Sequence, residues 1–208
     1  MAVIGILGAG GVARALARKL TDAGRTVVVG TRDVAKWDVP QARALSLAEA
    51  ADAGAILVNA LPGDVSVDVL GGLSKEIAGK TLVDVANAVV TDAHGFAVAL
   101  RYPESSLAEE LQRALPAARV VKALSTAHVA VMADPGALGD AADVFLSGDD
   151  PEAKASVTAL LDDLGWPVAR IVDLGGVASA RGPEGFVLMV GPLVRALGPV
   201  PFALAVAR

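Results

Sequence analysis

The sequence predicts an α/β protein of the Rossmann type, in which helices cover both faces of a doubly wound, mostly parallel sheet. Apolar runs alternate along the chain with segments of helical periodicity, as in repeated βαβ units. Several runs are continuously apolar, which is typical of strands buried on both faces. The first run ends in glycines that open a helix, the pattern of a nucleotide-binding turn.

This glycine-rich turn joins the first strand, residues 2–7, to the first helix. Gly8 permits a tight turn, Gly10 leaves space for a pyrophosphate, and Ala13 lets the helix pack close to the strand. The free N–H groups and the dipole of the helix would then face the phosphates. Arg14 could approach a phosphate, although a solvated face suits it better. The residues expected to bind a dinucleotide here are Gly8, Ala9, Gly10, Gly11, Val12 and Ala13.

The residues that follow the second strand, 26–30, indicate which dinucleotide binds. An NAD-preferring site places an acidic residue there to bind the ribose hydroxyls. This chain instead has Thr31 and Arg32, with Lys36 four residues further on, and a hydroxyl and two cations suit the 2′-phosphate of NADP. One such arginine would supply on the order of 10- to 150-fold preference for NADP. Asp33 offers an alternative, because it could pair with Arg32 or approach the ribose.

The later segments repeat the alternation of strands and helices. Apolar runs predict strands at 55–60, 81–85, 119–124, 142–147 and 167–172. Capping patterns and helical spacing predict a short helix from Ser46 and further helices at 64–78, 106–115, 127–133 and 151–164. The Gly71-Gly72 pair weakens the second of these helices, and residues 88–105 are expected to be rich in loops.

Polar or turn-forming residues follow the middle strands at the edge where ligands bind in open α/β sheets. The strand at 55–60 leads into Ala60, Leu61 and Pro62. Asn87 follows the strand at 81–85, where it could bind a ribose or an amide group, or cap a turn.

Three polar residues follow the strand at 119–124. Ser125 and Thr126 could face the nicotinamide or the acceptor, or they could cap the helix at 127–133. His128 is a further candidate, although a lone histidine is more often a surface or capping residue than a catalyst. Ser125, Thr126 and His128 are therefore the residues expected to contact the substrate.

Composition and charge exclude several function classes. The net charge of −5 argues against a nucleic-acid partner. The chain has no cysteine, which excludes disulfides and thiol catalysis and fits a cytoplasmic location. The N-terminus has no basic signal region, and no apolar run reaches the roughly 20 residues of a membrane span, so we expect no membrane association.

The chain lacks the side chains that carry most dehydrogenase chemistry. Its only tyrosine, Tyr102, has a serine four residues later, so the Tyr-x-x-x-Lys pair of short-chain dehydrogenases is absent. None of its six lysines lies in a clear general-acid context, and two histidines without cysteine argue against a transition metal. We therefore expect no catalytic side chain and no metal. A flat redox ring suits such a site as the small-molecule acceptor, because stacking two rings with reacting carbons about 3–3.5 Å apart suffices.

With these residues the chain resembles the F420-dependent NADP oxidoreductases over essentially its whole length. The early motifs are shared with many NADP enzymes, whereas the Lys-Ala-x-x-Thr pattern from Lys122 and the Gly-Asp-Asp pattern from Gly148 are more specific. The segments that carry the resemblance are 8–13, 28–32 with Lys36, 61–62, 121–126, 131–135, 148–150 and 174–181.

The resemblance implies a cofactor, NADP(H), that lies along the glycine turn with its 2′-phosphate on Thr31, Arg32 and Lys36. It also implies that the deazaflavin F420 stacks on the nicotinamide, so that hydride passes directly between the two rings. Because family members are commonly dimers, it implies a homodimer. The residues that correspond to strand ends near the nicotinamide are Leu61, Pro62, Leu124, Ser125 and Thr126.

Two positions depart from the family pattern. Ser125 stands where many relatives have Asn or His, and Ala88 stands where the usual pattern has Pro. Both lie at the cofactor edge, and they bear on the acceptor more than on NADP. The same module also forms the cytosolic part of ferric reductases, whose acceptor is a flavin.

We expect a single NADP-binding domain over residues 1–208, in which the mostly apolar residues 174–208 close the acceptor site or form a dimer surface. Three functions remain open on the sequence. The first is an NADPH oxidoreductase with a deazaflavin acceptor, and the second is the same chemistry with a flavin or another small acceptor. The third is a non-catalytic NADP-binding redox sensor, which a site sealed by residues 183–202 would favour.

Overall fold

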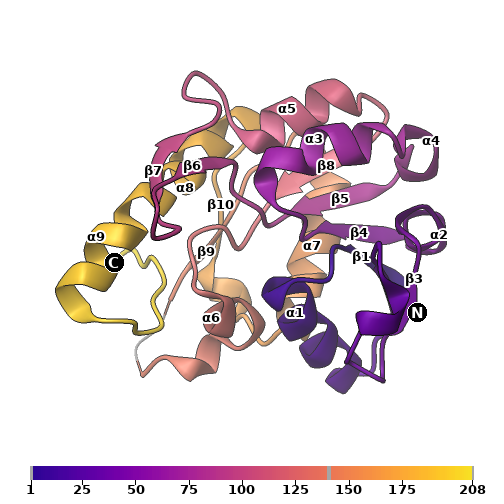
Figure 1. Ribbon diagram of the computed structural model, residues 1–208, viewed down its shortest axis with the longest axis horizontal. Coiled ribbons are helices and arrows are strands. Elements are labelled where there is room, and N and C mark those ends of the chain that lie inside the picture. The colour runs from indigo at the N-terminus through magenta and orange to yellow at the C-terminus, as the bar shows by residue number, and fades with distance from the viewer. Residues whose placement is uncertain (1, 140–141, 208) are drawn as a thin grey trace.

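A computed structural model describes residues 2–139 and 142–207, so the expected domain limits Met1 and Arg208 lie outside the described residues. Its centre is a six-stranded sheet in the order β3-β2-β1-β4-β5-β8, with every neighbouring pair parallel (Figure 1). These strands are β1 (Ile4–Leu7), β2 (Val27–Gly30), β3 (Arg43–Leu45), β4 (Ile56–Asn59), β5 (Thr81–Asp84) and β8 (Arg119–Lys122). The arrangement confirms the predicted parallel Rossmann-type sheet.

The strand order reverses at β1, which pairs with β2 on one side and with β4 on the other. This reversal creates the crevice at the carboxyl ends of the strands in which doubly wound sheets bind ligands. The glycine turn after β1 and the Leu61-Pro62 turn after β4 therefore lie side by side at the predicted edge: the Gly8 N–H donates to Gly30 O, and the Ala60 N–H donates to Leu7 O, each at 2.9 Å.

Helices cover both faces of the sheet, and each face has its own buried cluster. Helices α1, α6 and α7 pack on one face, and α2, α3 and α5 pack on the other; α1 and α3 lie on opposite sides of the strands in Figure 1. Neighbouring strand residues alternate between the clusters, as the pleat requires: Leu57 belongs to one and Val58 to the other. The helices are α1 (Gly11–Asp22), α2 (Leu47–Ala53), α3 (Gly63–Gly71), α4 (Ser74–Ile77), α5 (Leu107–Ala114), α6 (Val129–Ala133), α7 (Pro151–Asp163), α8 (Arg181–Gly185) and α9 (Val187–Leu197).

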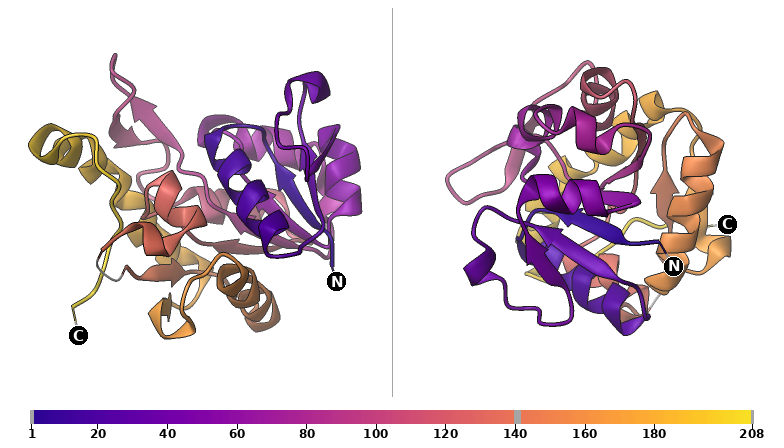
Figure 2. Two further views of the ribbon diagram at one scale, coloured as in Figure 1. Left: turned by 90° about the horizontal axis from the view of Figure 1, so that it is seen from below. Right: turned by 90° about the vertical axis from the view of Figure 1, so that its right-hand side faces the viewer.

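The second half of the chain adds two small sheets. Strands β9 (Val144–Leu146) and β10 (Ile171–Asp173) pair in parallel, and an antiparallel bridge between Lys122 and Ser147 joins them to β8. Strands β6 (Val89–Thr91) and β7 (Ala97–Leu100) form an antiparallel hairpin that packs against α9. The left view in Figure 2 agrees with Figure 1 that α9 and the hairpin lie at the end of the molecule away from β3.

Several local predictions differ from the structure. The expected helix at 64–78 is two helices, since α3 ends at Gly71 and Gly72 is its C-cap. The region 88–105, expected to be loop-rich, contains the β6–β7 hairpin. The expected strand at 167–172 begins as the 3₁₀ helix η3 (Val168–Arg170), because Pro167 starts a turn, and it becomes β10 only at Ile171. Edge strand β3 was not predicted, because three residues carry no readable alternation.

The remaining 3₁₀ helices are η1 (Val34–Lys36), η2 (Pro135–Ala137) and η4 (Val177–Ala180). Within the described ranges, no helix is both long and apolar enough to cross a membrane.

Candidate functional site

The glycine turn has the geometry of a phosphate-binding loop. Gly8 has φ +121°, and a Cβ there would lie 2.4 Å from the Ala60 carbonyl oxygen, so both conformation and packing require glycine. A Cβ on Gly10 or Gly11 would meet no protein atom within 4 Å. Gly10 is the N-cap of α1 and offers no side-chain cap, so the first N–H groups of the helix face open space. The turn therefore fits a bound anionic group.

A pocket of about 480 Å³ opens between the glycine turn, the end of β2 and the β4–α3 turn. It brings together seven of the predicted cofactor residues: Gly8, Ala9, Thr31, Arg32, Ala60, Leu61 and Pro62. The other predicted cofactor residues do not line it: Gly10, Gly11, Val12, Ala13, Lys36, Asn87, Leu124 and Ser125. Its remaining lining residues were not predicted: Gly30, Leu47, Asp64, Val65 and Val69. Val65 and Val69 lie one helical turn apart on α3, so both face the same side of the helix. Their helical spacing after Pro62 was the sequence signal that could have identified them as pocket residues.

Arg32 lies at the end of β2. Its side chain is exposed at the pocket and has no ion-pair partner among the described residues. Asp33, which could have neutralised it, lies instead 2.9 Å from Lys36 Nζ. Thr31 is fixed by its own backbone, whose N–H donates to the Leu45 carbonyl at 3.0 Å, and its hydroxyl oxygen accepts from the Asp33 N–H. The pocket thus presents an uncompensated guanidinium group where an NAD site would carry an acid.

Asn87 links the ends of β5 and β8. Its Nδ2 donates to the Ser125 carbonyl at 3.2 Å, whereas its Oδ1 is buried without a hydrogen-bond partner in the described part of the chain. The turn that contains Asn87 also packs tightly against the start of α3. A Cβ on Gly63, the first residue of that helix, would lie 2.2 Å from the Asn87 carbonyl oxygen. Since buried acceptors are normally satisfied, the Oδ1 atom fits a donor supplied by a ligand, such as an amide or a hydroxyl group.

Leu124 begins the loop after β8 in a strained conformation. Its φ is +62°, and it is the only non-glycine residue with a positive φ within the described ranges. The side chain is buried, so packing holds it there. Backbone strain of this kind concentrates at functional sites. No feature of the sequence signals it, because leucine rarely adopts this conformation.

The three predicted substrate residues are only partly accessible. Ser125 and Thr126 are 6% and 2% exposed, and His128 is half-buried. His128 is the N-cap of α6, and its Nδ1 accepts from the Ala130 N–H at 3.3 Å. The alternative that Ser125 or Thr126 caps this helix is therefore wrong, and the helix begins at Val129 rather than at 127.

The C-terminal tail covers these residues. The His128 N–H donates to the Phe202 carbonyl at 2.8 Å, and the Leu204 N–H donates to the Thr126 carbonyl at 3.2 Å. The His128 and Phe202 rings meet edge to face, 5.9 Å apart. The tail thus lies beside the loop after β8, joined to it by a single antiparallel bridge between Ala127 and Ala203.

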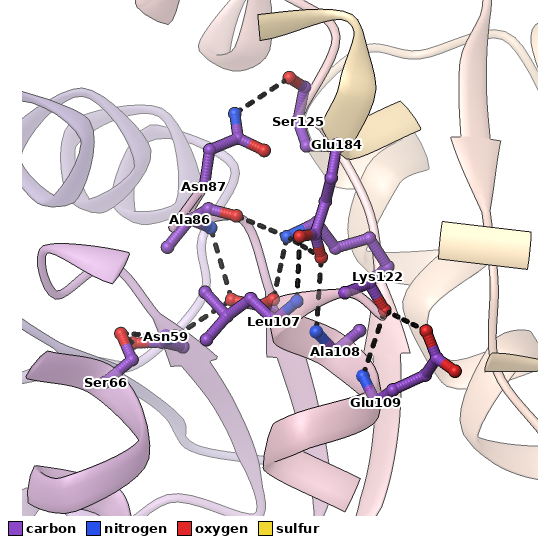
Figure 3. A network of polar contacts seen from close by, with 12 residues as sticks. Asn59, Ser66, Ala86, Asn87, Leu107, Ala108, Glu109, Lys122, Ser125 and Glu184 are labelled. Atoms are coloured by element: carbon purple, nitrogen blue, oxygen red, sulfur yellow. Dashed lines mark hydrogen bonds and ion pairs between the residues drawn. The ribbon is translucent and has the colours of Figure 1, made fainter. Parts of the chain in front are cut away.

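A buried ion network lies behind the strand ends (Figure 3). Lys122 is fully buried, and its Nζ lies 2.8 Å from Asp84 Oδ2 and 2.9 Å from Glu184 Oε1. It also donates to the Ala86 carbonyl, next to Asn87. Burial alone would lower the pKa of Lys122, but the two carboxylates raise it above its ordinary value, so the ammonium group stays charged.

The network extends from the pocket wall to the C-terminal helices. Asn59 Nδ2 donates to Asp84 Oδ1 at 2.8 Å (Figure 3). Asn59 Oδ1 accepts from the Leu61 N–H at 3.2 Å. At the other end, Glu184 in α8 accepts from the Leu107 N–H at 2.8 Å and so caps α5. Sequence reasoning missed this network, although a Lys and an Asp within apolar strands were a readable sign that the two pair.

No cluster of three or more His, Asp or Glu side chains that could hold a metal ion occurs in the part of the chain that the structure describes. The polar chemistry of the site is therefore carried by backbone N–H groups, Arg32, the Asn87 amide and the buried Lys122 network.

Comparisons with known proteins agree with this geometry. Residues 3–88 match the family of NADP oxidoreductases, coenzyme F420-dependent. The crystal structure of a candidate F420-dependent NADP reductase from Arthrobacter sp. FB24 superposes with a TM-score of 0.91 at 36% identity, and the match covers 100% of both chains.

Two curated proteins also match. The metalloreductase STEAP3 of Rattus norvegicus is 30% identical over 191 residues, which are 91% of this chain and 37% of that protein. The F420-dependent NADP reductase of Methanocaldococcus jannaschii is 28% identical over 134 residues, which are 64% of this chain and 59% of that protein. The matches thus span less than two thirds of the length of either curated relative. The glycine turn, the cationic strand end and the full-length likeness lead to one conclusion: the chain belongs to the F420-dependent NADP oxidoreductase family.

Proposed function

We propose that the chain is an oxidoreductase that transfers a hydride between NADP(H) and a flat redox acceptor, the deazaflavin F420. Family membership supports the reaction class, and the name of the Methanocaldococcus jannaschii relative supports the acceptor. The observation that carries the proposal is Arg32, whose guanidinium group lies at the pocket beside the end of β2 and has no ion-pair partner in the described parts of the chain. A 2′-phosphate is the group that distinguishes NADP from NAD, and a guanidinium group binds phosphate well.

Each part of the dinucleotide is proposed to bind at a successive strand end. The glycine turn and the N-terminus of α1 bind the pyrophosphate, through Gly8, Ala9, Gly10, Gly11, Val12 and Ala13. Thr31, Arg32 and Lys36 bind the 2′-phosphate, with the Lys36 ammonium shared with Asp33. Ala60, Leu61 and Pro62 form an apolar wall, and Asn87, Leu124 and Ser125 hold the nicotinamide end. The bound dinucleotide supplies or accepts the hydride, and the chain binds, orients and excludes water.

The acceptor is proposed to lie by the loop after β8, near Ser125, Thr126 and His128. Because the Ser125 and Thr126 side chains are buried, contact would come first from this loop's backbone and from the half-buried His128. No catalytic side chain is proposed, since a hydride that passes directly between two rings needs no general acid on the protein.

A second candidate differs only in the acceptor, which would be a flavin. The 30% identity to a metalloreductase, over 91% of this chain, favours it. A third candidate is a redox sensor that binds NADP without turnover. The C-terminal tail favours it, because the tail covers Thr126 and His128.

Residues 174–208 are proposed to belong to the same domain as the sheet, closing the acceptor end and forming a homodimer surface. The buried Glu184 supports the first part, because it joins α8 to Lys122. Exposed apolar side chains on the β6–β7 hairpin, α9 and the tail support the second: Val90, Val98, Met189, Leu197 and Val200.

Replacement of Arg32 tests the NADP assignment. Arg32→Ala should weaken NADPH binding by about 10- to 100-fold and leave NADH binding nearly unchanged, because only NADPH carries the 2′-phosphate. Titration of the fluorescence of each nucleotide measures both dissociation constants. Arg101→Ala is the matched control, since Arg101 is an exposed arginine that does not line the pocket. Equal losses for NADPH and NADH would contradict the assignment.

A further inference from the structure

Arg14 contacts two segments that are far apart in the sequence. Its Nη1 donates to the Ala9 carbonyl in the glycine turn, and its Nε lies 2.6 Å from Asp38 Oδ1. Its Nη2 donates to the Lys36 carbonyl at 3.5 Å, and its Cζ lies 5.5 Å from the centroid of the Trp37 ring. One side chain of α1 therefore joins the glycine turn to the loop after β2, where a solvated face was expected.

That loop connects β2 to the edge strand β3 and carries both proposed phosphate-binding cations. Its second half is fixed on itself, since Trp37 Nε1 donates to the Val39 and Ala42 carbonyls at 2.9 Å each. Its first half is exposed, and η1 is a single short turn. Arg14 contacts the loop at residues 36–38, directly after the exposed first half, and these contacts hold the loop against α1.

The charge of Arg14 is already met within the protein. Its hydrogen bond to Asp38 holds the pKa of that carboxyl below its ordinary value, so the pair is ionised at neutral pH. Arg32 differs, because no carboxylate within the described ranges pairs with it. The guanidinium group of Arg14 is thus committed to protein acceptors, whereas that of Arg32 is available to a ligand.

We propose that Arg14 is a positioning residue for NADP specificity: together with Asp38, it holds the loop that carries Arg32 and Lys36 at a fixed place relative to the glycine turn. One end of the dinucleotide site binds the pyrophosphate and the other binds the 2′-phosphate, so their spacing decides whether both bind at once. Arginine suits this task because its planar fork donates in several directions at once. The inference rests on the proposed function, since it assumes that NADP occupies the pocket.

Asp38→Asn gives the most informative test, because two explanations predict opposite changes in the affinity for NADPH. Removing a negative charge near an anion site should tighten NADPH binding if charge alone matters. If Asp38 acts through Arg14, the same change should weaken NADPH binding, because the loop loses a charge-assisted bond. We expect NADPH binding to weaken by about three- to ten-fold and NADH binding to change by less than about two-fold.

Arg14→Met and the double variant complete a thermodynamic cycle. Arg14→Met should weaken NADPH binding at least as much as Asp38→Asn, and the double variant should be no weaker than Arg14→Met. Arg18→Met is the matched control, because Arg18 lies one turn further along α1, is exposed, and makes no side-chain hydrogen bond or ion pair among the described residues. Arg18 acts on Asp38 through its charge alone, so this variant removes the same charge as Arg14→Met without removing a contact to the loop. Its nucleotide affinities should change by less than about two-fold.

Fluorescence titration with NADPH and NADH reads out all five proteins. Tighter NADPH binding by Asp38→Asn, additive losses in the double variant, or equal losses for the two nucleotides would each overturn the positioning role. Wild-type protein that binds neither nucleotide would overturn the proposed function instead. The two failures are therefore distinguishable.

Discussion

Some residues at the strand ends are recognisable by the chemistry of their side chains, and others by the backbone conformation that they must adopt. Thr31 and Arg32 could be proposed from the sequence as phosphate-binding residues, because their side-chain types match a phosphate. Gly8 could be assigned because its turn needs a positive φ. The roles of Arg14 and Lys122 could not be assigned, because each depends on partners more than twenty residues away in the chain.

Leu124 provides a test at this scale. A left-handed conformation costs a non-glycine residue about 1–2 kcal/mol, so glycine should be favoured over alanine at this position. We expect Leu124→Gly to have a free energy of unfolding about 1 kcal/mol higher than that of Leu124→Ala, although both lose the buried side chain. Denaturant unfolding measures the difference.

Leu111 in α5 serves as the control, because it is equally buried but lies in a helix. There the order should reverse, with Leu111→Ala about 1 kcal/mol more stable than Leu111→Gly. A glycine variant at position 124 that is less stable than the alanine variant would contradict the strain at Leu124.

Among the helices and strands, those with a clear hydrophobic or capping pattern were predicted from the sequence. The central strands were expected because their runs are continuously apolar, and α2 was expected because Ser46 and Glu49 form a capping box, which the structure shows. The β6–β7 hairpin and β3 were missed, since their strands are short and lie at sheet edges, where no burial pattern repeats. Tertiary contacts, not local sequence, create these elements.

The Lys122 ammonium group joins the sheet to α5 and α8, because it pairs with Asp84 in β5 and with Glu184 in α8, which in turn accepts from the first N–H of α5. Lys122→Met should lower the free energy of unfolding by about 3–5 kcal/mol, because two buried carboxylates lose their counter-charge. Adding Glu184→Gln should recover part of this loss, since the amide oxygen can still accept from the Leu107 N–H. Denaturant unfolding followed by circular dichroism measures each value.

The control is Lys19→Met, which removes a partly exposed ion pair with Asp134, 3.7 Å apart. Its effect should stay below about 1 kcal/mol. If Lys122→Met were no more damaging than this control, the buried network would not stabilise the fold.

On the scale of the whole molecule, the C-terminal segment links the proposed acceptor end to the sheet. Glu184 ties α8 to Lys122, and Phe202 and Leu204 tie the tail to the loop after β8. The sequence indicated an apolar segment without showing which surface it covers, because such contacts join residues far apart in the chain. The identity of the acceptor therefore depends on features that no motif encodes, whereas the residues proposed to bind the phosphates of NADP lie in or directly after the first βαβ unit.

Hydride transfer from NADPH to F420 is tested most directly by the rate at which the purified protein oxidises NADPH with F420 as acceptor. Parallel reactions with FMN, with FAD and with NADH in place of NADPH serve as controls. We expect turnover with F420, little turnover with the free flavins, and a rate at subsaturating NADH at least about 10-fold lower than with NADPH. Tight NADPH binding without reduction of F420 would contradict the proposed hydride transfer. Reduction of a flavin in that case would identify the second candidate, and no reduction at all would identify the sensor.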